Sequence, residues 1–138
     1  MKNKAGFLDL RNQEAIAEEY RQKLNVKTPS LEQKILNLSG GNQQKAIIAR
    51  WLMNNPRILF LDEPTLGIDI GAKEEIYHII NDLVKQGISV VLVSSEMQEI
   101  LSLCDRVIVM SEGNIMGEML HKDATEDRIM TLAAGIKE

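Results

Sequence analysis

Two short segments of this sequence contain residue types that could bind and activate a phosphate group. In the first, Leu38–Lys45, Ser39 and two glycines, Gly40 and Gly41, come directly before a helical pattern. Glycines leave backbone N–H groups open because no Cβ shields them, and the positive end of a helix dipole favours an anion. The segment therefore predicts a phosphate-binding turn, with the Ser39 hydroxyl as an added donor. Taken alone, Ser-Gly-Gly is more typical of an ordinary serine-capped helix.

The second segment, Ile58–Thr65, is a short apolar run that ends at Asp62 and Glu63. Two adjacent carboxylates at the end of a buried strand are costly to desolvate unless they have a role. In a phosphoryl-transfer site, Asp62 could hold Mg²⁺ through water and Glu63 could polarise an attacking water. Taken alone, the pattern is equally typical of a strand that ends in an acidic turn.

The spacing of apolar residues predicts the elements that hold these two segments. Helices are expected over residues 11–24, 42–54, 72–85, 96–103 and 125–134, and strands over 57–61, 89–93, 106–110 and 115–120. Strands alternate with helices from Arg57 to Ser95, which predicts an α/β fold with a mostly parallel sheet. The last two strands are expected to form an antiparallel hairpin on the edge of that sheet. We further expect the strand 57–61 to be buried on both faces and Trp51 to lie in the core.

Composition limits the classes of protein to consider. The 138 residues leave room for one domain, and a chain that is 44% hydrophobic and 26% charged is typical of a folded globular protein. No apolar run is longer than four residues, so no transmembrane helix is expected. The lone Cys104 and two distant histidines provide neither a disulfide nor a zinc site. A net charge of −4 argues against a nucleic-acid partner.

The order and spacing of the two segments resemble the nucleotide-binding domain of ABC ATPases. Ser39 precedes Asp62 by 23 residues, with one predicted helix between them. The family's signature motif is similar to Leu38–Gln43, its Walker B strand to Ile58–Glu63 and its D-loop to Leu66–Asp69. The resemblance implies a partial P-loop NTPase core plus part of the α-helical signature subdomain. It places the helical subdomain in residues 1–55, the distal half of the ATPase core in 56–121 and a C-terminal helix in 122–138.

Other segments look like the C-terminal cassette of the tandem ATPases that power bacterial monosaccharide importers of the ribose, galactose and xylose types. These segments are Lys27–Ser30, Asn42–Lys45, Gly67–Tyr77, Ser94–Met97 and Cys104–Met110. The resemblance implies a sugar-importer subunit that uses ATP and Mg²⁺ in the parent protein. Its implied partners are the N-terminal ATPase cassette of the same polypeptide, transmembrane permease subunits and, indirectly, a periplasmic sugar-binding protein. Its implied location is peripheral, on the cytoplasmic face of the bacterial plasma membrane.

The same resemblance assigns roles to individual residues. ABC cassettes pair head to tail, so the signature of one completes the ATP site of the other. The nucleotide-binding residues implied here are Ser39, Gly40, Gly41, Asn42, Gln43 and Asp69. Glu63 and Ser95 are implied for catalysis, and Asp62 for Mg²⁺ through water. Asn42 replaces the commoner Gln, and since the amide is kept we expect little loss.

The sequence departs from the family in two places. It contains no Gly-Lys dipeptide, and therefore no Walker A loop. We thus expect the chain to be the C-terminal part of a longer protein, and we expect this part alone neither to bind nor to hydrolyse ATP. Ser95 stands where a His usually contacts the γ-phosphate, and a hydroxyl is shorter and neutral. This change is common in the C-terminal sugar-importer cassette, and it puts in doubt whether Glu63 serves a fully active site.

Two other function classes stay open at this stage. A non-transport ABC ATPase for DNA repair or chromosome organisation would carry long coiled coils beside the signature, and none is predicted. A non-catalytic module would act by association. Uncovered strand edges and apolar faces predict that the chain itself self-associates. The sequence does not specify which sugar is transported.

Overall fold

The computed structural model describes residues 10–136, which form two compact units. The first unit contains the described residues up to Leu59 together with Pro64–Val90. The second contains Phe60–Glu63 and the residues from Val91 onward. The outer ends of the first and last predicted domains, residues 1–9 and 137–138, lie outside the described residues.

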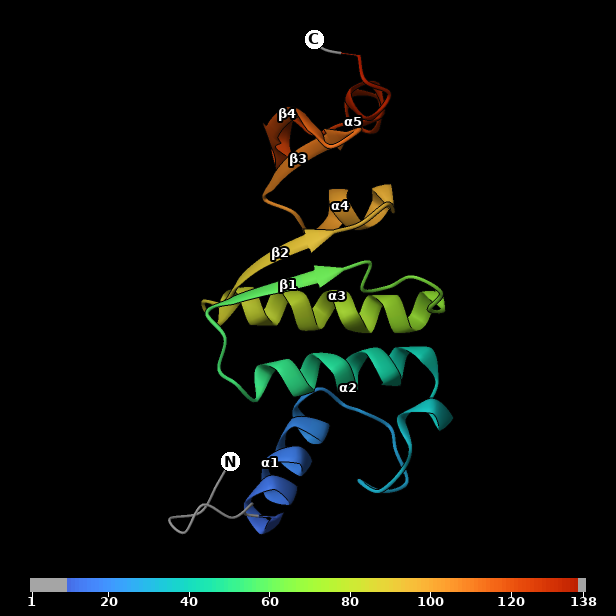
Figure 1. Cartoon of the computed structure of the whole chain (residues 1–138), viewed down its shortest axis with the longest axis vertical. Helices are drawn as coiled ribbons and strands as arrows, with labels where there is room; N and C mark the ends of the chain where they lie inside the picture. The colour runs from blue at the N-terminus through green and yellow to red at the C-terminus, as the bar shows by residue number, and fades with distance from the viewer. Residues whose placement is uncertain (1–9, 137–138) are drawn as a thin grey trace. The chain divides into compact units, whose positions relative to one another are not determined.

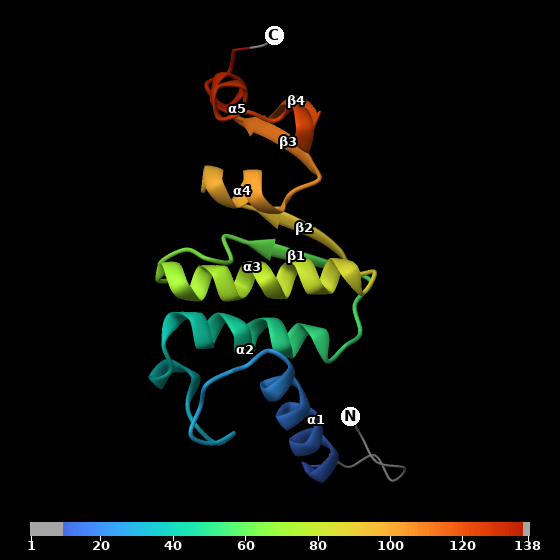
Figure 2. The same cartoon turned by 180° about the vertical axis from the view of Figure 1, so that it is seen from behind.

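Two helices that lie side by side, α2 (Gly40–Leu52) and α3 (Ile70–Lys85), form the centre of the first unit (Figures 1 and 2). Helix α1 (Leu10–Lys23) contacts α2. A 3-10 helix, η1 (Ile35–Asn37), comes directly before α2 in the chain. The predicted helices match these elements to within about two residues at most ends, as expected for boundaries.

The buried side of α2 explains why Trp51 is not in the core. The buried residues recur at helical spacing: Gly41, Lys45, Ile48, Ala49 and Leu52. Trp51 lies off this stripe and is 55% exposed, so the prediction that it is a core residue is wrong. On α3 the buried residues also recur at helical spacing: Ile76, Ile80 and Leu83.

Strands β1 (Ile58–Asp62) and β2 (Ser89–Val93) pair in a two-stranded sheet. Ser89 N–H donates to Arg57 O at one end and Glu63 N–H donates to Val93 O at the other, so the strands are parallel, as predicted (Figure 1). Burial alternates along β1, which contradicts the prediction that both faces are covered. Within the described residues only the Leu59 and Leu61 face is covered, and Phe60 is 72% exposed.

The second unit contains an antiparallel hairpin, as predicted, of β3 (Arg106–Ser111) and β4 (Asn114–Leu120). The hairpin is not on the edge of the parallel sheet, because among the described strands it forms a sheet of its own. Helix α5 (Glu126–Ala133) packs on it, while α4 (Met97–Leu103) and the 3-10 helix η2 (His121–Asp123) flank it in sequence. The core consists of Val107, Val109, Met119, Ile129 and Leu132.

A glycine in β4 leaves room for the Leu132 side chain of α5. A Cβ added to Gly117 would stand 2.8 Å from Leu132 Cδ1. Thr125 caps the start of α5, because its Oγ1 accepts a hydrogen bond from Arg128 N–H at 3.3 Å. In the part of the chain that the structure describes, no helix combines the length and the apolar character needed to cross a membrane.

Candidate functional site

The start of α2 exposes the predicted phosphate-binding turn. Ser39 is the N-cap residue, with extended backbone angles (φ −61°, ψ 155°), and its side chain makes no capping hydrogen bond. Ser39 and Gly40 are both exposed. Since the first N–H groups of a helix have no partner within it, this end offers amide donors and the positive end of the helix dipole to a ligand.

The two adjacent glycines have different surroundings. A Cβ added to Gly40 would meet only Ile68 Cγ1 at 3.8 Å and Gly67 O at 3.9 Å, which are ordinary contacts. A Cβ added to Gly41 would stand 2.5 Å from Cβ of Ala72 on α3. Gly41 is buried, so its missing side chain serves helix packing, whereas Gly40 lies open to a ligand.

The amides of Asn42 and Gln43 bind groups within the protein. Asn42 Oδ1 accepts from Lys27 N–H at 2.7 Å, and its Nδ2 donates to Ser39 Oγ at 2.9 Å. Gln43 Nε2 donates to Leu38 O at 2.8 Å. Both side chains thus shape the turn around Ser39.

The structure brings the D-loop segment Leu66–Asp69 next to the start of α2. The ideal Cβ position of Gly40 is near Gly67 O and Ile68, and Gly67 has a positive φ of 71° that favours glycine. The Asp69 side chain caps α3, because its Oδ1 accepts a hydrogen bond from Ala72 N–H at 3.0 Å.

The second unit holds the carboxylate pair and Ser95. Asp62 is exposed at the end of β1, and Glu63 has a left-handed φ of 44°, which is strained for a side chain of its size. Glu63 Oε1 accepts a hydrogen bond from Ser95 N–H at 2.8 Å. The structure therefore brings Glu63 and Ser95 together, and the contact uses the Ser95 backbone.

Magnesium would need ligands beyond this chain's own side chains. In residues 10–136 no three His, Cys, Asp or Glu side chains gather into a metal site. The Asp62 carboxylate offers the oxygen ligand that Mg²⁺ prefers, and nucleotide phosphates and water would supply the rest. The donor set thus fits a nucleotide-bound Mg²⁺ and does not fit a stand-alone metal centre.

The sequence reasoning missed an ion pair between a buried lysine and a partly exposed glutamate behind the turn. Lys45 Nζ donates to Asn25 O at 2.6 Å and to Glu75 Oε2 at 2.8 Å, and the Lys45 side chain is only 3% exposed. The hydrogen bond from Lys45 lowers the pKa of the Glu75 carboxyl from its ordinary value. The signal was present in the sequence, because Lys45 lies on the same helical face as Gly41, Ile48 and Leu52.

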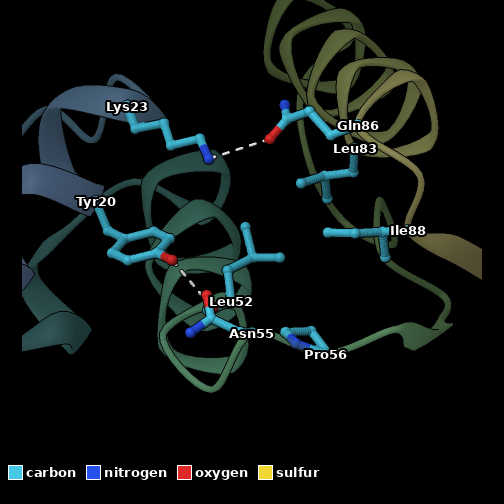
Figure 3. A pocket seen from close by; sticks show the side chains of 8 residues that line it. All are labelled: Tyr20, Lys23, Leu52, Asn55, Pro56, Leu83, Gln86 and Ile88. Carbon is cyan, nitrogen blue, oxygen red and sulfur yellow. Dashed lines mark hydrogen bonds between the residues drawn. The ribbon is translucent and has the colours of Figure 1, made fainter.

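A cavity of about 230 Å³ lies at the other end of α2 (Figure 3). Across it Tyr20 Oη donates to Leu52 O at 3.0 Å, and Lys23 Nζ donates to Gln86 Oε1 at 3.2 Å. These bonds brace α1 against the ends of α2 and α3. The polar groups they use are already paired, so we assign this cavity a structural role.

Comparison with known proteins agrees with this fold and these motifs. The sequence profile of the ABC transporter family matches residues 2–66. A dimeric ATP-binding cassette bound to ADP and Pi aligns with a TM-score of 0.73 and 28% identity, over 84% of this chain and 50% of that chain. A putative metal-chelate type ABC transporter shares the fold, with a TM-score of 0.82 over 97% of this chain and 53% of that chain at 19% identity. The chain is thus part of an ABC transporter ATPase domain.

The relatives in sequence that match most of this chain bear the names of sugar import ATP-binding proteins. A putative ribose/galactose/methyl galactoside import ATP-binding protein of Geobacillus kaustophilus is 61% identical over 132 residues, 96% of this chain. A xylose import ATP-binding protein of the same organism is 54% identical over 121 residues, and an arabinose import ATP-binding protein of Pectobacterium atrosepticum is 55% identical over 131. The chain spans about a quarter of the length of these relatives, namely 26%, 24% and 26%.

Proposed function

We propose that this chain forms part of the ATP-binding subunit of a bacterial monosaccharide importer, within its C-terminal cassette. The observation that carries the proposal is the 61% identity, over nearly the whole chain, to a putative ribose/galactose/methyl galactoside import ATP-binding protein. In the whole protein, ATP hydrolysis drives sugar uptake. The subunit binds transmembrane permease subunits on the cytoplasmic face of the membrane, and a periplasmic binding protein delivers the sugar to them.

In this proposal the start of α2 completes an ATP site whose other half belongs to the N-terminal cassette of the same polypeptide. Ser39 Oγ and the Gly40 amide would donate to the terminal phosphate. The exposure of both residues and the absence of a Cβ at Gly40 support this role. Each preorganised donor of this kind contributes on the order of 3 kcal/mol to transition-state stabilisation.

The site that contains Glu63 and Asp62 would be weaker than its counterpart. Ser95 offers no imidazole, and its N–H already holds the Glu63 carboxylate at 2.8 Å. An acceptor that is engaged in this way is a poorer base for water. Because the sequence contains no Walker A loop, we propose further that the chain alone neither binds ATP tightly nor hydrolyses it.

The test is Ser39→Arg in the full-length importer ATPase, assembled with its permease in liposomes. We expect ATPase rate and sugar uptake to fall about 100-fold, because a bulky side chain displaces the phosphate from its donors. The control is Asn81→Arg, which places the same side chain at an exposed position on α3. Full activity of the Ser39→Arg protein would contradict the proposed role of this turn.

A further inference from the structure

Asn42 connects the signature turn to a loop that lies 15 residues earlier in the sequence. Its Oδ1 accepts the backbone N–H of Lys27 at 2.7 Å, and its Nδ2 donates to the Ser39 hydroxyl oxygen at 2.9 Å. The second bond spans three residues across the first turn of α2. One amide group thus bridges the loop and the residue proposed to touch phosphate.

The chemistry of the partners fixes which way this amide points. A backbone N–H can only donate, so the group that faces Lys27 must be the amide oxygen. The amide nitrogen then faces Ser39 and donates to its oxygen. With one Ser39 lone pair occupied in this way, the hydroxyl proton cannot point at Asn42 and is available for an acceptor on the exposed side.

The loop that orients Asn42 is itself fixed to both helices. Lys45 of α2 donates to Asn25 O at 2.6 Å and to Glu75 of α3 at 2.8 Å, and Lys27 Nζ is 3.9 Å from Glu75 Oε1. Asn25 has a left-handed φ of 49°. These contacts hold the Lys27 backbone N–H in place. A group held in this way can preorganise the Asn42 side chain that it binds.

We propose that Asn42 is a positioning residue: it directs the Ser39 hydroxyl proton outward, towards the terminal phosphate of ATP. The proposal rests on the proposed function, because it assigns Asn42 a role at that same site. It also departs from the expectation that Asn42 contacts the nucleotide. Asn42 acts through Ser39, so its contribution should vanish when the Ser39 hydroxyl is absent.

The experiment measures kcat and KM for ATP in the full-length ATPase assembled with its permease. Asn42→Leu keeps a similar shape but leaves the Ser39 hydroxyl free to rotate, and we expect kcat to fall about tenfold with KM changed less than about twofold. Asn42→Gln keeps the amide and should retain kcat within about threefold. Asn81→Leu on the exposed side of α3 is the matched control.

The decisive comparison repeats Asn42→Leu in a Ser39→Ala background. If Asn42 acts only through the hydroxyl, the tenfold effect disappears in this background. A general structural role would instead lower kcat equally in both. If Asn42→Leu does not fold, Asn42→Asp replaces it: the carboxylate accepts the Ser39 proton and turns it inward, and kcat should fall about 100-fold.

The outcomes separate the two proposals. The positioning role is refuted if Ser39→Ala loses activity while Asn42→Leu and Asn42→Asp keep it. It is also refuted if Asn42→Leu lowers kcat equally with and without the Ser39 hydroxyl. In both cases the proposed function stands. If Ser39→Ala itself keeps full activity, the proposed function of the turn fails. The positioning role is supported if Asn42→Leu lowers kcat selectively, Asn42→Gln keeps kcat, and Asn42→Leu has no further effect in the Ser39→Ala background.

Discussion

The substitution Gly41→Ala tests whether the second glycine of the turn serves packing. A Cβ at this position would stand 2.5 Å from Ala72 Cβ, whereas carbon atoms meet favourably at about 3.5–4.0 Å. Helices α2 and α3 must therefore move apart by roughly 1 Å, and a gap of that size forfeits up to half of the attraction between neighbouring atoms.

The expected cost follows from two opposing effects. Overpacking of a well-filled contact costs about 1–3 kcal/mol, and replacing glycine by alanine in a helix returns up to about 1 kcal/mol. The net loss in free energy of unfolding should be about 1–2 kcal/mol. With a urea m value of about 2 kcal/mol/M, in the middle of the usual range, the unfolding midpoint should fall by about 0.5–1 M.

Urea unfolding of the chain at low micromolar concentration, followed by far-UV circular dichroism, measures this effect. Gly40→Ala is the matched control, because its Cβ meets nothing closer than 3.8 Å and the midpoint should not fall. The double variant Gly41→Ala/Ala72→Gly removes the clash and should recover the part of the loss that is due to overpacking. Equal midpoints for Gly40→Ala and Gly41→Ala would refute the assignment of separate roles to the two glycines.

Three further outcomes are expected. Lys45→Met should lower the free energy of unfolding by about 1–3 kcal/mol, because the methionine keeps the buried stem but loses both hydrogen bonds; a change below 0.5 kcal/mol, measured in urea, would contradict this. Lys45 lowers the pKa of Glu75, so the stabilisation by this pair is complete above the ordinary pKa of 4.5 and is lost as the pH falls through the lowered pKa. Glu75→Gln should therefore reduce the loss of unfolding free energy at acid pH. The same loss in the variant and the parent chain would contradict a stabilising role of the pair. Phe60→Lys should reduce self-association of the chain in sedimentation experiments, whereas a monomeric parent chain would show that the exposed strand face is not adhesive.

Local patterns were sufficient to predict most of the elements. The stripe on α3 and the cap at Thr125 are set by residues within a turn or two of each other, and both are present in the structure. The hairpin turn was predictable for the same reason: Glu112 and Gly113 both have positive φ, at 48° and 78°, and glycine at such a position is a strong local signal.

Burial was harder to predict, because it depends on what covers an element. The run Ile58–Leu61 is continuously apolar, yet only Leu59 and Leu61 are covered by described residues. Trp51 is apolar but lies outside the stripe that faces α3. Composition alone could not distinguish these cases, whereas helical spacing could have excluded Trp51 and included Lys45.

The candidate site was predicted in its residues but not in its contacts. Spacing placed Ser39 and Gly40 at a helix start and Glu63 at a strand end. The bonds from Asn42 to Lys27 and from Ser95 to Glu63 join residues 15 and 32 positions apart, and such pairings arise from the folded chain. Sequence spacing therefore does not determine side-chain roles, and in the structure the side-chain amides of Asn42 and Gln43 bind groups within the protein.

Hydrogen exchange of the backbone amides tests most directly whether the start of α2 binds a nucleotide phosphate. In the full-length ATPase, the first-turn amides of residues 40–42, which have no partner within the helix, should exchange more slowly when a non-hydrolysable ATP analogue is bound, while residues 78–84 on α3 should be unaffected. Exchange at residues 40–42 that stays unchanged with both ATP sites of the protein occupied would show that this turn does not contact the nucleotide.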